Sequence, residues 1–185
     1  MSGATNKILS PRIGLAALVI ALALAPSLLG SFSISLLNDI GIGALVALGL
    51  VMLTGVGGAT SFGQAAFVGI GAYATGWLTT VHGVSPWLGL VFALALSGLA
   101  ALAIGALTLR LSGHYLPLSS IAWGLSIALL FGNVDALGRH TGLSNIPPLM
   151  LGVWSLVDPR SIYYLIWVMV GLACLFSYKI GRAHV

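Results

Sequence analysis

The chain has 185 residues, of which 59% are hydrophobic and only 5% are charged, and its formal net charge is +4 at pH 7. A water-soluble domain needs far more charged side chains on its surface, so this composition excludes one and predicts a polytopic membrane protein. The seven Lys and Arg residues are scattered along the chain, which favours a role in membrane topology over nucleic-acid binding.

The sequence contains no residue cluster that predicts catalysis or metal binding. Cys174 is the only cysteine, and the four histidines are far apart, so neither a disulfide framework nor a ligand spacing is present. Nucleophile-elbow, phosphate-loop and zinc-helix motifs are also absent. We therefore predict no catalytic residue, no cofactor and no bound metal, and the protein is not expected to be an enzyme.

The chain begins with a short polar stretch, residues 1–12, followed by an apolar run at 13–29. This run resembles a signal peptide, but no A-x-A-like cleavage site follows it and further apolar segments do. We therefore predict a first transmembrane helix. The stretch 30–39 is expected to be a polar connection, with Asp39 near the start of the next helix, where its charge suits the helix dipole.

A second span is predicted at about 40–53, short of the usual 20 or so residues, and it runs into a glycine-rich break at Thr54–Gly63. The break holds four glycines and three hydroxyl side chains: Gly55, Gly57, Gly58, Gly63, Thr54, Thr60 and Ser61. Glycines at this density end a helix. At membrane depth, an opened backbone is tolerated only where protein buries it or where it lines a watery cavity.

A third helix is predicted at about 61–81, directly after the break. Ser61 and Gln64 have the spacing of a capping box. Small residues then recur on one face, where another helix can pack closely: Ala65, Gly69, Ala72 and Gly76. A helix whose positive end points into the protein is typical of a transport site. The alternatives are that Ser61 and Gln64 only cap the helix and that the glycines only allow close packing.

The rest of the chain predicts three more spans, at about 87–109, 116–131 and 162–178. A turn at 82–86 precedes the first of them, and the stretch 132–161 is expected to be a long ordered loop outside the membrane. The predicted fold is therefore an all-α membrane protein with about six transmembrane helices and a broken helix at Thr54–Gly63. Residues 13–178 would form its transmembrane domain.

The basic residues predict the orientation of the helices. With the N-terminus in the cytoplasm, four of them fall on the cytoplasmic side: Lys7, Arg12, Arg110 and Lys179. Arg139 and Arg160 then fall outside, in the long loop. Arg110 is expected to be a topological anchor, with a gating role as the alternative. His114 and Tyr115 are expected to lie at the membrane interface.

The C-terminal residues 179–185 are expected to be a truncated or non-native end. The codons for the last six residues, I-G-R-A-H-V, can coincide with the start of a common sequencing adapter. The alternative is a natural segment that is merely cut short.

Four segments, in order, resemble the signature of branched-chain amino acid ABC transporter permeases of the LivM/LivH type. The run G-L-V-M-L-T-G-V-G-G-A-T-S-F-G-Q-A-A-F-V-G-I-G-A-Y spans Gly49 to Tyr73. It is followed by L-R-L-S-G-H-Y-L at 109–116, T-G-L-S-N-I-P at 141–147 and I-Y-Y-L at 162–165. The resemblance covers about 41–178. It departs where Gln64 replaces a common histidine and where Ala59 replaces a usual glutamine, which bears on the identity of the solute.

This resemblance implies one subunit of an importer in the bacterial inner membrane. The implied partners are a second permease subunit, two cytoplasmic ATPase subunits and a periplasmic solute-binding protein, besides the lipid bilayer; nucleic acid is not among them. The region that would contact the ATPase is expected to follow Tyr178. An amino acid carries a carboxylate, which the free N–H groups of a helix N-terminus can bind.

The candidate solute path comprises ten residues: Thr54, Gly55, Gly57, Gly58, Ser61, Gly63, Gln64, Phe67, Gly69 and Tyr73. Phe67 and Tyr73 have packing as their alternative role. In the long loop, a surface that faces the binding protein is predicted at Thr141, Gly142 and Asn145, and simple loop order would explain these residues equally well.

Two rival functions remain open at the level of sequence. One is an ABC permease for another solute, such as urea or a short amide. The other is a channel or structural bundle that works without ATP. A pore is expected to show polar or charged rings on several helices, whereas here the polar residues are concentrated in one break.

Overall fold

The computed structural model describes residues 11–58, 61–108, 115–151 and 154–183, and these residues form an all-α protein. The helices are α1 (Pro11–Leu28), α2 (Ser31–Gly55), α3 (Gln64–His82), α4 (Pro86–Thr108), α5 (Tyr115–Asn133) and α6 (Pro159–Ala183). The predicted fold class is thus confirmed. Four helices, α2, α4, α5 and α6, are long and apolar enough to cross a membrane. The count of six spans stays a prediction.

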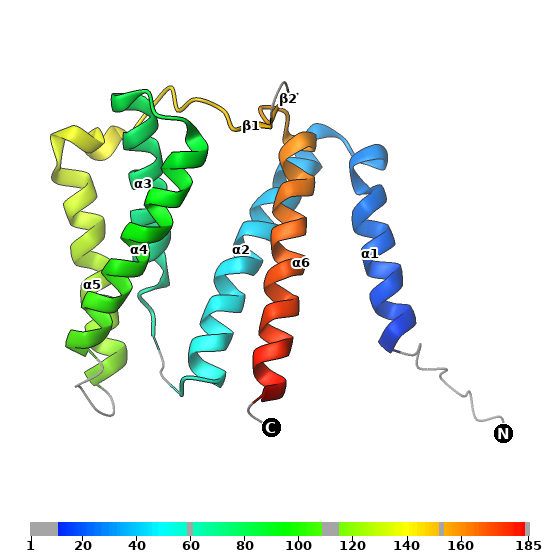
Figure 1. Ribbon diagram of the computed structural model, residues 1–185, viewed down its shortest axis with the longest axis horizontal. Coiled ribbons are helices and arrows are strands. Elements are labelled where there is room, and N and C mark those ends of the chain that lie inside the picture. The colour runs from blue at the N-terminus through cyan, green and yellow to red at the C-terminus, as the bar shows by residue number, and fades with distance from the viewer. Residues whose placement is uncertain (1–10, 59–60, 109–114, 152–153, 184–185) are drawn as a thin grey trace.

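The helices run up and down in two groups, with α1 set apart (Figure 1). Helices α3, α4 and α5 pack together, and α2 packs along α6. One end of the bundle, which we call the loop end, carries the connection from α5 to α6. The other end, which we call the break end, carries the end of α2 and the start of α5.

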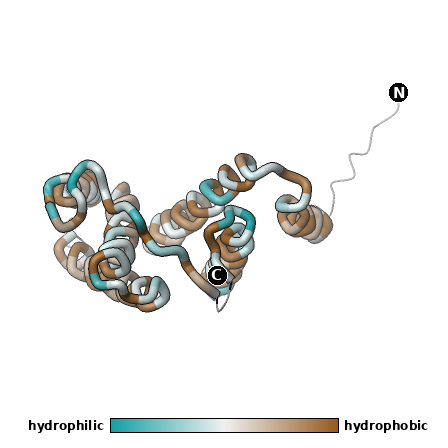
Figure 2. The backbone as a smooth tube through the Cα atoms, turned by 90° about the horizontal axis from the view of Figure 1, so that it is seen from above, coloured by the Kyte–Doolittle hydropathy of each residue, from teal (hydrophilic) through white to brown (hydrophobic). Residues whose placement is uncertain are grey.

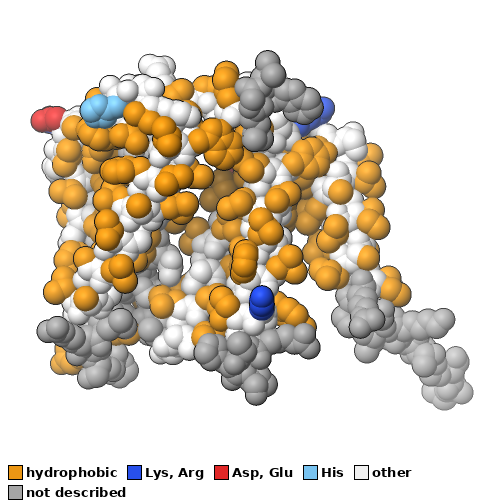
Figure 3. All heavy atoms as spheres, viewed as in Figure 1, with side chains coloured by type: hydrophobic (Ala, Val, Ile, Leu, Met, Phe, Trp, Pro, Cys, Tyr) orange, Lys and Arg blue, Asp and Glu red, His pale blue; other side chains and the backbone are white. Residues whose placement is uncertain are grey.

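The surface of the bundle is apolar around the helices, as a lipid-facing surface requires. Seen down the helix axes, hydrophobic residues surround each helix and hydrophilic ones gather on the connections (Figure 2). The space-filling view shows hydrophobic side chains along the whole height of the visible face, with charged side chains only near the two ends (Figure 3). Phe32, Leu94 and Leu102 are 83%, 67% and 72% exposed, and such large apolar side chains are more stable in hydrocarbon than in water.

Helix α2 begins at Ser31, about nine residues before the predicted start. The expected connection at 30–39 is therefore wrong, and Asp39 lies well inside the helix. One face of this first part of α2 packs against α6, where Ile34 and Asn38 are buried. The polar Asn38 is tolerated there because its Nδ2 donates to the carbonyl oxygen of Pro159 at 3.0 Å.

The packing of α2 against α6 is tightest at Gly41. A Cβ atom built on this residue would lie 2.6 Å from the Cγ2 of Ile166 and 3.6 Å from the indole of Trp167. Real carbon atoms do not approach this closely, so the two helices touch only because this position lacks a side chain. Small residues allow the same close approach between helices in membranes generally.

Helix α1 is hydrogen-bonded to α6 at a carbonyl group that a proline leaves free. Pro26 lies inside α1, and because proline has no N–H, the carbonyl of Leu22 loses its partner within the helix. The hydroxyl of Tyr163, which is 1% exposed, donates to that carbonyl oxygen at 2.8 Å. Near the loop end, the Arg160 guanidinium also donates to the carbonyl of Leu29, at 3.4 Å. The bond from Tyr163 thus satisfies a carbonyl group inside the helical bundle that Pro26 leaves without a partner.

The connection between α5 and α6 holds two short 3-10 turns, η1 (Asp135–Leu137) and η2 (Arg139–Thr141). It also holds an antiparallel pair of two-residue strands, β1 (Met150–Leu151) and β2 (Trp154–Ser155). Helix α6 starts at Pro159, three residues before the predicted span, and continues to Ala183. The turn predicted at 82–86 is confirmed, with Gly83 at φ +62° ending α3.

Candidate functional site

The predicted break lies between α2 and α3. Helix α2 ends at Gly55, and α3 begins at Gln64. Residues 59 and 60 lie outside the described part of the chain, so the place of Thr60 within the break is not described. In Figure 1 the connection leaves the break end and leads back up the bundle toward α3.

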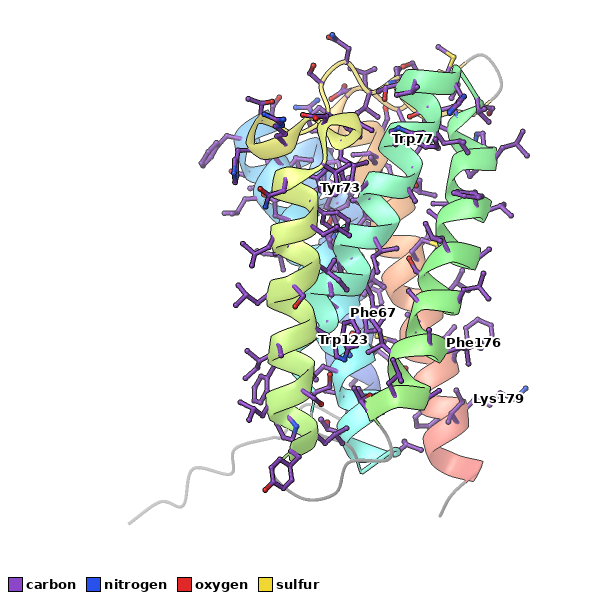
Figure 4. All side chains as sticks on the ribbon, turned by 90° about the vertical axis from the view of Figure 1, so that its left-hand side faces the viewer. Phe67, Tyr73, Trp77, Trp123, Phe176 and Lys179 are labelled. Carbon is purple, nitrogen blue, oxygen red and sulfur yellow. The ribbon has the colours of Figure 1, made fainter. Side chains whose placement is uncertain are left out.

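Helix α3 consequently starts part-way up the bundle. Phe67, the fourth residue of α3, lies at a height similar to that of Trp123, the ninth residue of α5 (Figure 4). Both side chains line the same cavity. The N–H groups in the first turn of a helix have no acceptor within it. Those of α3 therefore lie inside the bundle and not at its end.

Two positions of the break require glycine, one because a side chain has no space there and one because of its backbone conformation. A Cβ atom on Gly57 would lie 2.6 Å from the carbonyl oxygen of Leu53, which is backbone and cannot move aside. Gly58 has φ +62°, a left-handed conformation that costs a β-branched residue strain. Thr54 and Gly55 form the last turn of α2, where the Thr54 hydroxyl donates to the carbonyl oxygen of Leu50 at 2.9 Å.

The capping box predicted for Ser61 and Gln64 is wrong. The residue that caps α3 is Gly63, and no side chain hydrogen bonds to the helix at that position. The Ser61 Oγ instead accepts from the N–H of Gly63 at 3.3 Å. The Gln64 side chain is directed toward α2: its amide oxygen would lie 4.0 Å from a Cβ atom built on Gly49.

Ser120 of α5 contacts the break from the opposite side and was not among the predicted path residues. The N–H of Phe62 donates to the Ser120 Oγ at 2.9 Å, and this hydroxyl donates to the carbonyl oxygen of Pro117 at 2.7 Å. Ser120 is 8% exposed. The signal in the sequence was the adjacent pair Ser119-Ser120 in a span whose other polar side chain is Ser126.

A cavity of about 250 Å³ opens where the break meets α3, α4 and α5. Among the predicted path residues, Ser61, Gly63 and Phe67 line it. The other lining residues, which the sequence analysis did not single out, are Leu53, Ala66, Ala101, Ile104, Gly105, Thr108, Leu116, Ser120 and Trp123. None of the lining side chains is charged. The walls are aliphatic and aromatic, with hydroxyl groups near the break, so the cavity fits a small solute with an apolar part.

Gly69 and Tyr73 lie farther along α3, toward the loop end, and pack against α5. A Cβ atom on Gly69 would lie 2.8 Å from the Phe131 ring, and the rings of Tyr73 and Phe131 stack at 4.4 Å between centroids. A second cavity of about 300 Å³ lies between α3 and α5 below this stack, and Gly69, Ala66 and Phe131 are among its lining residues. The predicted small-residue face is thus a packing face at Gly69.

The loop residues predicted to face a binding protein lie over the end of α3. A Cβ atom built on Gly142 would lie 3.9 Å from the Tyr73 hydroxyl oxygen. Asn145 has a left-handed backbone conformation, with φ +59°. The Thr141 hydroxyl donates to the carbonyl oxygen of Gly138 at 2.6 Å. Leu143 and Ile146, which follow Gly142, cover Gly76 of α3. The loop therefore closes the space between α3 and α5 at the loop end.

Metal-ligating residues do not gather anywhere in the described part of the chain. Cys174 is exposed on α6, and Asp135 pairs with Arg139 at the surface of the loop. Arg110, the predicted topological anchor, and His114, predicted to lie at the membrane interface, are outside the described residues. The chemistry that the described cavity offers is therefore binding by uncharged groups.

Comparison with known proteins points to transport. Residues 32–182 match the family described as branched-chain amino acid transport system / permease component. The match begins in α2 and includes the break and the cavity.

Two curated relatives carry the name high-affinity branched-chain amino acid transport system permease protein LivM. The protein from Salmonella typhimurium is 32% identical over 141 residues, which are 75% of this chain and 33% of that protein. The Escherichia coli protein is 32% identical over 111 residues, 59% of this chain and 26% of that protein. The chain thus matches about a third of the length of these relatives or less. No solved structure matches it significantly.

The match covers most of the chain, it includes all four segments quoted from the sequence, and it agrees with the apolar, all-α fold. The chain belongs to the family of branched-chain amino acid transport system permease components.

Proposed function

We propose that this chain forms part of the solute path of an ABC importer for branched-chain or related amino acids, with the cavity at the start of α3 on that path. The family and the names of the relatives support the amino-acid solute. The observation that carries the proposal is the cavity itself: it joins the opened backbone at Ser61 and Gly63 to apolar walls from α4 and α5.

The physical chemistry of this cavity suits an amino acid. The Ala66 N–H in the first turn of α3 already bonds to the Gly63 carbonyl oxygen at 3.1 Å, so what this turn brings to a carboxylate is chiefly the positive end of the helix dipole. The apolar side, formed by Ile104, Leu116 and Trp123, suits an aliphatic side chain, whose transfer out of water is favourable. Because all contacts are uncharged, the solute is held weakly enough to be released, as transport requires.

The importer that we propose contains several proteins. Two cytoplasmic ATPase subunits would supply the energy, a second permease subunit would complete the path, and a periplasmic solute-binding protein would deliver the solute. The proposed docking surface for that protein is Thr141, Gly142 and Asn145 at the loop end. This assignment is supported by the position of the loop over α3, where Leu143 and Ile146 cover Gly76.

We further propose that the break end faces the cytoplasm of a bacterial inner membrane and that the loop end faces outside. Basic residues support this orientation: Lys179 lies at the break end (Figure 4), and Arg12 belongs to the first turn of α1, which starts at the same end.

Cysteine labelling tests the orientation. Ser144 and Tyr115 are both exposed, Ser144 at the loop end and Tyr115 at the break end. In a Cys174→Ala background, a membrane-impermeant thiol reagent added outside spheroplasts should therefore label Ser144→Cys and not Tyr115→Cys. In inverted vesicles the pattern should reverse. Labelling of both variants from one side would contradict the orientation.

Uptake by a reconstituted complex tests the function. Proteoliposomes are prepared with a full-length permease that contains this sequence and the ATPase-contacting region expected after Tyr178, together with its partner permease and the ATPases. With ATP on the ATPase side of the membrane and the binding protein on the opposite side, they should transport leucine, isoleucine or valine. Uptake of urea or acetamide, with no uptake of these amino acids, would assign a different solute. Solute flux without ATP or partners would show a channel and overturn the proposal.

A further inference from the structure

Ser120 connects two parts of the chain that lie far apart in sequence. Its hydroxyl accepts the N–H of Phe62 in the break at 2.9 Å and donates to the carbonyl oxygen of Pro117 in its own helix at 2.7 Å. The residue is buried and lines the cavity. It is therefore the point where α5 contacts the break through a side-chain hydrogen bond.

The chemistry of this contact requires a hydroxyl group. One side-chain atom has to donate to the Pro117 carbonyl and at the same time accept from the Phe62 N–H, and a hydroxyl has both capacities. An alanine would remove the acceptor of the Phe62 N–H, which is part-buried, and a donor that loses its partner inside the protein is costly.

The backbone around Ser120 is shaped to receive the break. A Cβ atom on Gly63 would lie 3.1 Å from the Ser120 carbonyl oxygen, and one on Gly124 would lie 4.0 Å from the Gly63 Cα. Ser120 and Gly124 are one helical turn apart, so they form one face of α5. The break therefore lies directly against α5, and Gly63 and Gly124 leave room for its backbone.

We propose that Ser120 is a positioning residue for transport: it fixes the segment 61–63 against α5 and so sets the shape of the cavity at the start of α3. The effect on transport rests on the proposed function. The claim that Ser120 fixes the segment 61–63 rests only on the hydrogen bond. Ser120 would act through Phe62 and Gly63 and not by reacting with the solute.

Amide hydrogen exchange tests the structural part. The protein would be studied in lipid nanodiscs, with exchange resolved to single amides. In Ser120→Ala, the Phe62 amide should exchange at least about tenfold faster than in the unchanged protein, because its acceptor is lost. Ser120→Thr keeps the hydroxyl and should restore slow exchange.

Ser119→Ala is the matched control. The Ser119 hydroxyl donates to the carbonyl of Leu116 at 2.9 Å, as Ser120 does to Pro117, but it accepts no bond from the described residues of the break. Its loss should leave exchange at Phe62 unchanged. Equal exchange at Phe62 in Ser120→Ala and in the unchanged protein would overturn the inference.

Transport by the reconstituted importer tests the consequence. Per assembled complex, Ser120→Ala should lower uptake at least fivefold, Ser120→Thr should restore it, and Ser119→Ala should leave it intact. Faster exchange at Phe62 with normal uptake would make the bond merely structural and overturn the positioning role. Failure of the unchanged importer to take up any amino acid would refute the proposed function, and the exchange experiment would still decide whether Ser120 holds Phe62.

Discussion

Replacing Gly41 with leucine should separate α2 from α6. A Cβ atom at this position already meets the Ile166 side chain at 2.6 Å, so a leucine has no space unless the helices move apart. Overpacking of this kind costs about 3 kcal/mol when the backbone has to shift. The loss should appear as a lower midpoint of thermal unfolding in nanodiscs and as a change in tryptophan fluorescence, since Trp167 lies at the contact.

Gly43→Leu is the control for this prediction. Gly43 lies two residues farther along α2, and a Cβ atom built there meets nothing within 4 Å. Its replacement should leave the unfolding midpoint unchanged or raise it slightly, because glycine lowers helix propensity. Equal stability of Gly41→Leu and Gly43→Leu would show that α2 and α6 are not packed as described.

Replacing Gly58 with valine should abolish solute uptake while the complex still assembles. Gly58 has φ +62°, which valine can adopt only with strain of roughly 1–3 kcal/mol. The break would relieve that strain by changing its course beside the cavity. Uptake per assembled complex should fall at least about tenfold. Gly57→Val should do the same, because its Cβ atom would collide with the Leu53 carbonyl oxygen.

Gly83→Val is the control that shows whether lost uptake comes from backbone strain alone or from a change in the solute path. Gly83 has the same φ of +62°, and a Cβ atom built there also meets nothing within 4 Å, but it ends α3 at the loop end, away from the cavity. This variant should lose similar stability and keep its uptake per assembled complex. If both variants lose uptake equally, the effect of Gly58→Val is one of stability, and the break has no special role.

Much of the fold was predictable from the sequence, because the signal was local. Apolar runs of helical length gave the helices, and the dense glycines gave the break between Gly55 and Gln64. The start of α2 was missed since Ser33, Ser35 and Asn38 look like a polar connection. They are helical because the Asn38 amide bonds to the Pro159 carbonyl, 121 residues away in sequence, and no local pattern contains such a contact.

The candidate site was predictable only on one side. The composition of the glycine-rich break singles it out in the sequence, and Ser61 and Gly63 of the break line the cavity. The α4 and α5 walls of the cavity were not predicted, because Ile104 or Trp123 has the same character whether it faces lipid or a cavity. The capping box failed for a related reason: the bond that holds the start of α3 comes from Ser120 on another helix. Sequence spacing cannot reveal that partner.

The most direct test of the solute path is the uptake of leucine by two variants of α4. Ala101 and Ala103 are both exposed on α4, but Ala101 is among the residues that line the cavity and Ala103, two residues farther along the helix, is not. Tryptophan at Ala101 should fill most of the space that a solute needs, and tryptophan at Ala103 should enter the lipid.

The measurement is ATP-driven leucine uptake in proteoliposomes, normalised to assembled complex. If the cavity lies on the path, Ala101→Trp should reduce uptake at least about tenfold and Ala103→Trp should leave it within twofold of the unchanged importer. Normal uptake by Ala101→Trp would show that the solute passes elsewhere and that the cavity at the start of α3 is not part of the path.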